Sequence, residues 1–173
     1  MRFLLSFFLI FTINAAEFKS YEAEFNFETK FGNFPLKRFF LVEDTEINTK
    51  VKMEVLWFKY SIDSNFRIEN KQIVSVNTNV SDPFRDPPKK FKASFSRNII
   101  NSEKLGKFEF TGSVLEQLLR DVQVRLNAKY GLKNYQLSIF DNTKAEIISK
   151  NYRQLENEIV STNFGNIDTI VVV

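Results

Sequence analysis

The 173-residue sequence contains no histidine and no cysteine, so the most common catalytic and metal-binding side chains are missing. Without imidazole there is no Ser-His-Asp triad and no side chain that ordinarily titrates near neutral pH. Without thiolates there are no disulfides, zinc fingers or iron–sulfur ligands. Carboxylates, assisted by lysine or tyrosine, are the acid–base chemistry that remains.

The acidic residues follow the period of a strand and do not gather in one place. Glu22, Glu24 and Glu28 alternate with apolar residues, and Glu46 and Glu54 do the same further along the chain. This period of two puts them on the solvent face of a strand, where carboxylates keep ordinary acidity. We therefore expect a protein that is not an enzyme and has no cofactor and no metal site. A carboxylate-dependent hydrolase is the weaker alternative.

Large apolar side chains, in contrast, occupy single faces of the predicted strands. If the sheet curls, such a face either packs as ordinary core or encloses a cavity of the size of a lipid. The sequence leaves both readings open. The candidate ligand-lining residues are Tyr21, Phe25, Phe27, Val51, Met53, Val55 and Trp57.

A second candidate site is basic and lies in and after a proline-rich stretch. It could bind an anionic partner such as phospholipid headgroups or lipopolysaccharide. The alternative is a solvated loop whose lysines prevent a sheet edge from pairing with another chain. The basic residues are Arg85, Lys89, Lys90, Lys92 and Arg97, with Asp86 as the one acidic residue among them.

The first sixteen residues have the order of a secretory signal peptide. Met1 and Arg2 precede an apolar run over 3–13, and Asn14-Ala15-Ala16 supplies small residues for cleavage. The apolar run is too short to span a bilayer as an anchor. Arg2 carries the only charge of this segment, so its removal reduces the formal charge from +3 to +2. We expect an exported, periplasmic protein with no transmembrane segment after cleavage, and such weak charge gives no reason to expect a nucleic-acid partner.

Alternating apolar and polar residues dominate the chain after residue 20, which predicts antiparallel strands joined by short turns. The stretch 81–88 contains three prolines, which remove ladder donors, so we expect a loop there. We also expect a break in the fourth strand at 63–65. The predicted strands are 21–28, 36–42, 46–55, 58–68, 73–77, 91–95, 107–110, 135–139, 145–152, 156–162 and 168–173.

One amphipathic helix is predicted over 114–129. Ser113 and Glu116 have the spacing of a capping box, and Gly131 stands where a helix-terminating glycine belongs. The apolar stripe consists of Leu115, Leu118, Leu119, Val122 and Leu126. The expected fold is mainly β: one domain over 17–173, in which a curved antiparallel sheet or open barrel packs against this helix.

Three segments resemble the bacterial family catalogued as domain of unknown function 3108, whose members are typically exported. These are the strand Tyr21-x-Ala23-x-Phe25 before the turn at Gly32, and the helical segment 112–120. The third and most specific is Glu158-x-Val160-x-Thr162-x-x-Gly165 in a strand–turn–strand. The acidic residue and serine expected inside the family's helix are only partly matched, by Glu116 and Ser113.

The resemblance implies an exported β domain of unassigned activity and supplies no catalytic residue. The family's fold would continue with further strands beyond Val173, and the chain ends in the apolar strand 170–173. A bare apolar edge favours aggregation. The sequence therefore leaves open whether the domain ends here or is incomplete at its C-terminus.

Two functions follow as expectations. The first is a non-enzymatic binding or carrier module for an apolar or lipid-like ligand, which rests on the fold-level likeness to lipid carriers. The alternative is a structural or interaction protein of the cell envelope that acts through a sheet edge or the 81–90 loop. The expected partner is accordingly either a lipid-like ligand or an envelope protein.

Overall fold

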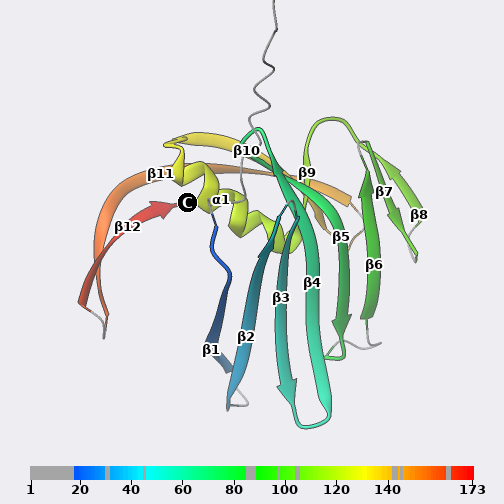
Figure 1. The fold of residues 1–173 in the computed structure, drawn as a ribbon, viewed down its shortest axis with the longest axis horizontal. Helices are drawn as coiled ribbons and strands as arrows, with labels where there is room; N and C mark the ends of the chain where they lie inside the picture. Colours follow the sequence, from blue (N-terminus) through cyan, green and yellow to red (C-terminus); the bar gives the residue numbers. More distant parts are fainter. Residues whose placement is uncertain are drawn as a thin grey trace, which may run out of the picture.

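The computed structural model confirms a mainly β fold with one helix. It describes residues 18–29, 32–44, 46–84, 89–96, 98–103, 106–141, 144, 146–162 and 165–173, and the side chains of 27–29 and 162 lie outside this description. Two curved sheets face each other with the helix between them, in the manner of a half-barrel (Figure 1). The predicted signal peptide lies outside the described residues.

The larger sheet is an eight-stranded meander in which each strand is antiparallel to the next along the chain. Alternating sequences joined by short turns give this topology because one face can be buried while the other stays solvated. The strands are β1 (Tyr21–Thr29), β2 (Gly32–Glu43), β3 (Glu46–Val55), β4 (Phe58–Glu69), β5 (Gln72–Asp82), β6 (Lys89–Ser96), β7 (Ile99–Ser102) and β8 (Gly106–Glu109).

The smaller sheet follows in the order β12-β11-β10-β9. Its short strand β9 is parallel to β10, and the other two pairs are antiparallel. A 3-10 turn, η2, and the helix α1 form the connection from β9 to β10. The elements are β9 (Val114–Glu116), η2 (Gln117–Leu119), α1 (Arg120–Lys129), β10 (Asn134–Asp141), β11 (Glu146–Thr162) and β12 (Gly165–Val172).

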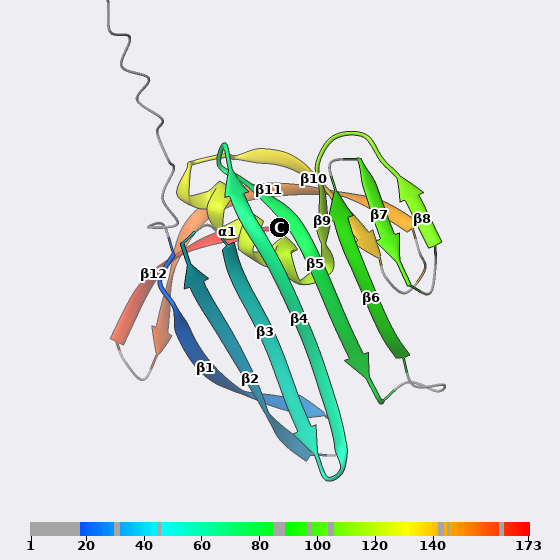
Figure 2. The same ribbon diagram turned by 45° about the vertical axis from the view of Figure 1, so that its right-hand side comes forward.

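The core lies between the inner face of the large sheet, meaning the face that contacts η2 and α1, and the layer formed by η2, α1, β9 and β10. Seen from two directions, this layer crosses only one end of the long strands (Figures 1 and 2). One buried cluster contains Phe40, Ile47, Phe66, Ile73, Leu115, Leu119, Val122 and Leu126. The second contains Val80, Phe91, Ala93, Ile100, Val114 and Phe140.

The helix ends where the sequence predicts but begins later. Gly131 has a φ of 70° and follows the last helical turn, as expected of a terminating glycine. The residues predicted as its first turns form β9 and η2 instead. Glu116 caps this 3-10 turn by accepting a hydrogen bond of 2.8 Å from the Leu118 N–H, while β9 pairs with β10. The predicted capping box at Ser113 is therefore wrong, because strand pairing takes the residues it would need.

The predicted interruption of the fourth strand is also wrong. β4 runs through 63–65 and pairs with both neighbours there, with a bulge after Asn65. Asp63 and Asn65 point to the outer face, where the Asn48 side-chain amide donates to both at 2.7 Å. Short polar residues that suggested a turn are thus bonded to residues across the sheet. Similarly, β11 is continuous over the predicted gap at 153–155, with a register irregularity between Gln154 and Asn157.

Candidate ligand-binding face

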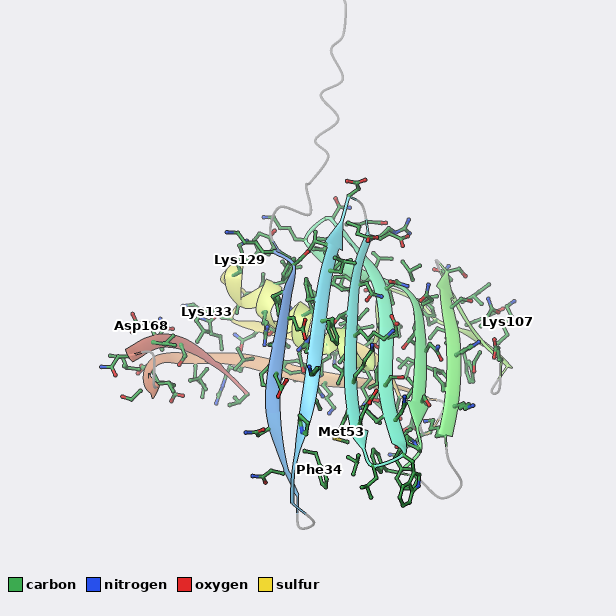
Figure 3. The ribbon with its side chains drawn as sticks, turned by 60° about the horizontal axis from the view of Figure 1, so that its bottom comes forward. Phe34, Met53, Lys107, Lys129, Lys133 and Asp168 are labelled. Atoms are coloured by element: carbon green, nitrogen blue, oxygen red, sulfur yellow. The ribbon has the colours of Figure 1, made fainter. Side chains whose placement is uncertain are left out.

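The long strands of the large sheet extend beyond the layer that covers their other end. Phe34 and Met53 lie near this free end (Figure 3). We call the apolar surface there the platform. It consists of Phe25, Leu36, Met53, Val55, Phe58 and Phe84.

Strand register makes the platform continuous across four strands. Phe25 lies opposite Leu36, Leu36 opposite Met53, and Met53 opposite Tyr60, so these four side chains share one face. That face is the inner one, because Phe40 and Ile47 stand on it at even spacings and belong to the core. Phe25 is 51% exposed, although it faces inward.

Aromatic rings gather at one end of the platform, where β3 turns into β4. The Trp57 ring lies 5.6 Å from that of Phe58, and Phe58 lies 5.7 Å from Phe84. Trp57 is 76% exposed and Leu56 is 81% exposed. The chain therefore presents large apolar side chains to solvent where a packed core would hide them.

The structure divides the predicted ligand-lining residues into two groups. Phe25, Met53 and Val55 belong to the platform and Trp57 adjoins it, whereas Val51 is buried. Tyr21 stacks on the core residue Phe40 with 5.2 Å between ring centroids. The side chain of Phe27 lies outside the described residues.

Sequence reasoning missed three residues of the platform. Leu36 and Phe58 carried a usable signal, since both keep the parity of their predicted strands. Phe84 carried none, because it follows Pro83 in the stretch predicted as a loop and reaches Phe58 only through the fold.

Arg38 occupies the inner face at the boundary between the platform and the core, and sequence reasoning missed it as well. Register places it opposite Ala23 on one side and Val51 on the other. Its Nε and Nη2 atoms are buried and have no hydrogen-bond partner among the described residues. Along the inner rows of β2, β3 and β4, whose residues are all described, Arg38 is the one charged side chain.

A buried polar network lies nearby, beneath the 3-10 turn. Glu116, which is 1% exposed, accepts a 3.0 Å hydrogen bond from the Ser64 hydroxyl, and its own N–H donates to Ser75 Oγ at 3.0 Å. Burial raises the pKa of the Glu116 carboxyl to about 7, against which the hydrogen bonds from Leu118 and Ser64 act. Glu116 thus ties the covering layer to β4 through its carboxyl and to β5 through its backbone N–H.

The predicted basic patch is divided between the two faces of β6. Lys90 and Lys92 are exposed on the outer face, where they line a depression of about 680 Å³, and Lys92 approaches Glu103 at 3.9 Å. Lys89 alternates to the inner face and stands 5.7 Å from the ring centroid of Phe91. Arg85 and Arg97 lie outside the described residues.

Two other depressions in the described part of the chain are lined mainly by polar residues. One of about 490 Å³ over β5, β6 and β7 is lined by asparagine, serine and threonine side chains with Lys92 and Glu103. Another of about 310 Å³ lies between α1 and β10 and includes Gln123, Asn127 and Tyr135. The described residues contain no group of acidic side chains that could hold a metal ion. Nor do they include a helix long and apolar enough to cross a membrane.

Comparison of the chain with models of protein families, with curated proteins and with solved structures gave no match.

Proposed function

We propose that the protein is a non-enzymatic binding or carrier module for an apolar, lipid-like ligand, which it holds on the platform. The observation that carries this proposal is the extension of the inner face beyond its covering layer, with Phe25, Phe58 and Phe84 left 37–51% exposed. Apolar surface of this kind is stabilised when it is removed from water. An open apolar surface accommodates acyl chains of different length, because it has no closed end.

We propose further that the protein acts in the periplasm after removal of residues 1–16. The order of a short positive segment, an apolar run and small residues supports export. The resemblance to the exported domain of unknown function 3108 family agrees with this location. Envelope compartments are where acyl chains must be shielded from water in transit. The N-terminal residue and the cell fraction of the mature protein test this part.

The lone tryptophan provides a direct test of ligand binding. Trp57 is 76% exposed and borders the platform, so a bound acyl chain should shield its indole from water. We expect titration with 1-decanol, below its solubility limit, to shift the emission to shorter wavelength and to saturate. Native mass spectrometry of protein from its own host should also detect a co-purified amphiphile.

Two matched variants separate binding at the platform from general adsorption. Met53→Asp places a charge in the middle of the platform and should abolish the shift. Ile159→Asp introduces the same charge at a side chain of β11 that is 67% exposed, and should leave the shift unchanged. An emission that does not change with either 1-decanol or decanoate would contradict the proposal. So would a stable dimer that Met53→Asp dissociates, since a second copy would then cover the platform.

A second candidate is an interaction protein of the cell envelope, and the β11–β12 hairpin favours it. Ile159, Ile167 and Ile170 are 67%, 47% and 45% exposed on this hairpin, and β12 is an edge strand. Unpaired edges with apolar side chains are suited to strand addition by another protein. Ile167→Lys together with Ile170→Lys should abolish capture of an envelope partner, whereas Met53→Asp should not affect it.

A further inference from the structure

We propose that Arg38 is the head-group site of the platform and that the ligand is a single-chain amphiphile with a carboxylate head. This inference rests on the proposed function, since it names the chemistry of the ligand that the platform would hold. Its basis is a half-buried cation, located where the apolar surface meets the core, whose buried Nε and Nη2 atoms have no hydrogen-bond partner among the described residues.

Burial without a partner is costly for a guanidinium, because arginine keeps its positive charge at physiological pH. Proteins normally meet this cost with a carboxylate or with several acceptor oxygens. Register surrounds Arg38 with Leu36 and Phe40 on its own strand and with Ala23 and Val51 on the neighbouring strands. None of these side chains offers an acceptor.

Two carboxylates, those of Asp82 and Glu116, face the interior between the sheet and its covering layer, and neither forms a hydrogen bond with the Nε or Nη2 atom of Arg38. Asp82 pairs in register with Lys89 on β6, and β5 lies three strand spacings from β2, which is about 14 Å. Glu116 accepts hydrogen bonds at its Oε2 atom from the Ser64 hydroxyl and the Leu118 N–H, and its buried Oε1 atom has no partner, Arg38 included, among the described residues. The counter-charge for Arg38 is therefore not supplied by these groups.

The two unpaired nitrogens define which head fits. Nε and Nη2 lie on the same edge of the planar guanidinium and present two parallel N–H groups, which match the two oxygens of a carboxylate. The Thr49 hydroxyl, also buried and without a partner in the described part of the chain, belongs to the adjacent inner row of β3. Side chains diagonal across neighbouring strands are within reach of each other, so this hydroxyl can donate a third hydrogen bond.

The acyl chain of such a ligand can then extend over apolar surface in one direction only. From Arg38 the inner face of β2 continues through Leu36 to Phe34, about 13 Å along the strand. Met53 flanks Leu36 on β3, and Phe34 and Met53 lie toward the free end of the sheet (Figure 3). In the opposite direction the next residue, Phe40, is closed off by the core.

The experiment compares ten-carbon amphiphiles that differ in the head alone, measured by calorimetry below their micelle concentrations. We expect decanoate to bind the wild type about 10- to 100-fold more tightly than 1-decanol, as for hydrogen bonds to a charged group. Arg38→Met should remove this difference in affinity without weakening the binding of 1-decanol. Lys37→Met is the matched control. Lys37 directly precedes Arg38 but lies on the outer face, where its Nζ atom is 3.5 Å from Glu24 Oε2.

Each of the other possible results would contradict one specific part of the proposal. Equal affinity of the wild type for decanoate and 1-decanol overturns the role of Arg38 and leaves the platform standing. Tighter binding of decyl phosphate than of decanoate overturns the carboxylate head. If neither decanoate nor 1-decanol binds, the proposed function itself fails. If Arg38→Met does not fold, Arg38→Lys serves the same test. This variant keeps the charge but loses the parallel N–H pair, so it should also reduce the preference for decanoate over 1-decanol.

Discussion

The Ser64 hydroxyl donates a hydrogen bond of 3.0 Å to Glu116 Oε2, joining the middle of β4 to a residue 52 positions later in the chain. Thr78 Oγ1 on β5 lies 3.0 Å from the same Ser64 oxygen. Because Glu116 also caps the 3-10 turn, its carboxyl attaches the covering layer to β4 directly and to β5 through the Ser64–Thr78 contact.

The burial of Glu116 should make stability depend on pH. Its pKa is about 7 in the folded protein and 4.5 in the unfolded chain, so the folded state binds the proton more tightly. The ionised carboxyl therefore costs stability above about pH 7, and this cost disappears as pH falls from about 7 to 4.5. We expect Glu116→Gln to reduce this pH-dependent increase in the unfolding free energy by up to about 3 kcal/mol.

Urea unfolding of wild type and Glu116→Gln at pH 8, 6.5 and 5 measures this effect. Glu158→Gln, at an exposed position on β11, serves as the control and should keep the wild-type profile. Parallel profiles of the wild type and Glu116→Gln would contradict the assignment.

The outer face has its own polar network, centred on Asp63. Lys50 Nζ lies 2.6 Å from Asp63 Oδ2, and both side chains are about one-third exposed. Burial raises the pKa of Asp63, but hydrogen bonds from Lys50 and Asn48 and the charges of Lys50 and Lys52 hold it below its ordinary value. A double-mutant cycle with Lys50→Met and Asp63→Asn should give a coupling free energy of about 0.5–1 kcal/mol.

The Asp63 network should affect stability with pH in the opposite direction to Glu116. A lowered folded pKa gives stability that is present above about pH 4 and is lost as pH falls through that folded pKa. The cycle should therefore be repeated in acid, where the coupling should vanish. The exposed pair Lys107 and Glu109, at 3.3 Å, should give a smaller coupling under all conditions.

Leu119 should be among the most sensitive positions of the core. It is fully buried between the large sheet and α1, so Leu119→Ala leaves a cavity and should lower the unfolding free energy by about 2–5 kcal/mol. Leu132→Ala, at a side chain 42% exposed, should cost well under half as much. Equal effects of the two substitutions in urea unfolding would show that the covering layer does not pack as described.

Gly131 tests the end of the helix. Its φ of 70° is unfavourable for residues with a Cβ atom, although nothing lies within 4 Å of where that atom would stand. Gly131→Ala should therefore cost about 1–2 kcal/mol through the backbone alone. Gly131→Asn should cost less, because asparagine tolerates this conformation. Thermal unfolding of both variants distinguishes this backbone effect from a clash, which would penalise the larger side chain more.

Local pattern was sufficient to predict the kind of fold. The alternation in 46–55 requires one buried and one solvated face whatever the partners are, and β3 has both. The stripe of Leu119, Val122 and Leu126 likewise requires a buried helix face. Pattern was insufficient at Ser64, because a short polar residue in an apolar run looks the same whether it ends a strand or bonds a buried carboxyl.

By itself, then, the sequence determined that this protein is a β domain with a helix that ends just before Gly131, and that it lacks imidazole and thiol chemistry. Only the tertiary structure decided how far the inner face is covered. That boundary is set by where β9 pairs with β10 and where Glu116 meets Ser64, which are contacts between residues far apart in the chain. Val51 is buried, whereas Met53, two residues later on the same face, is left on the platform.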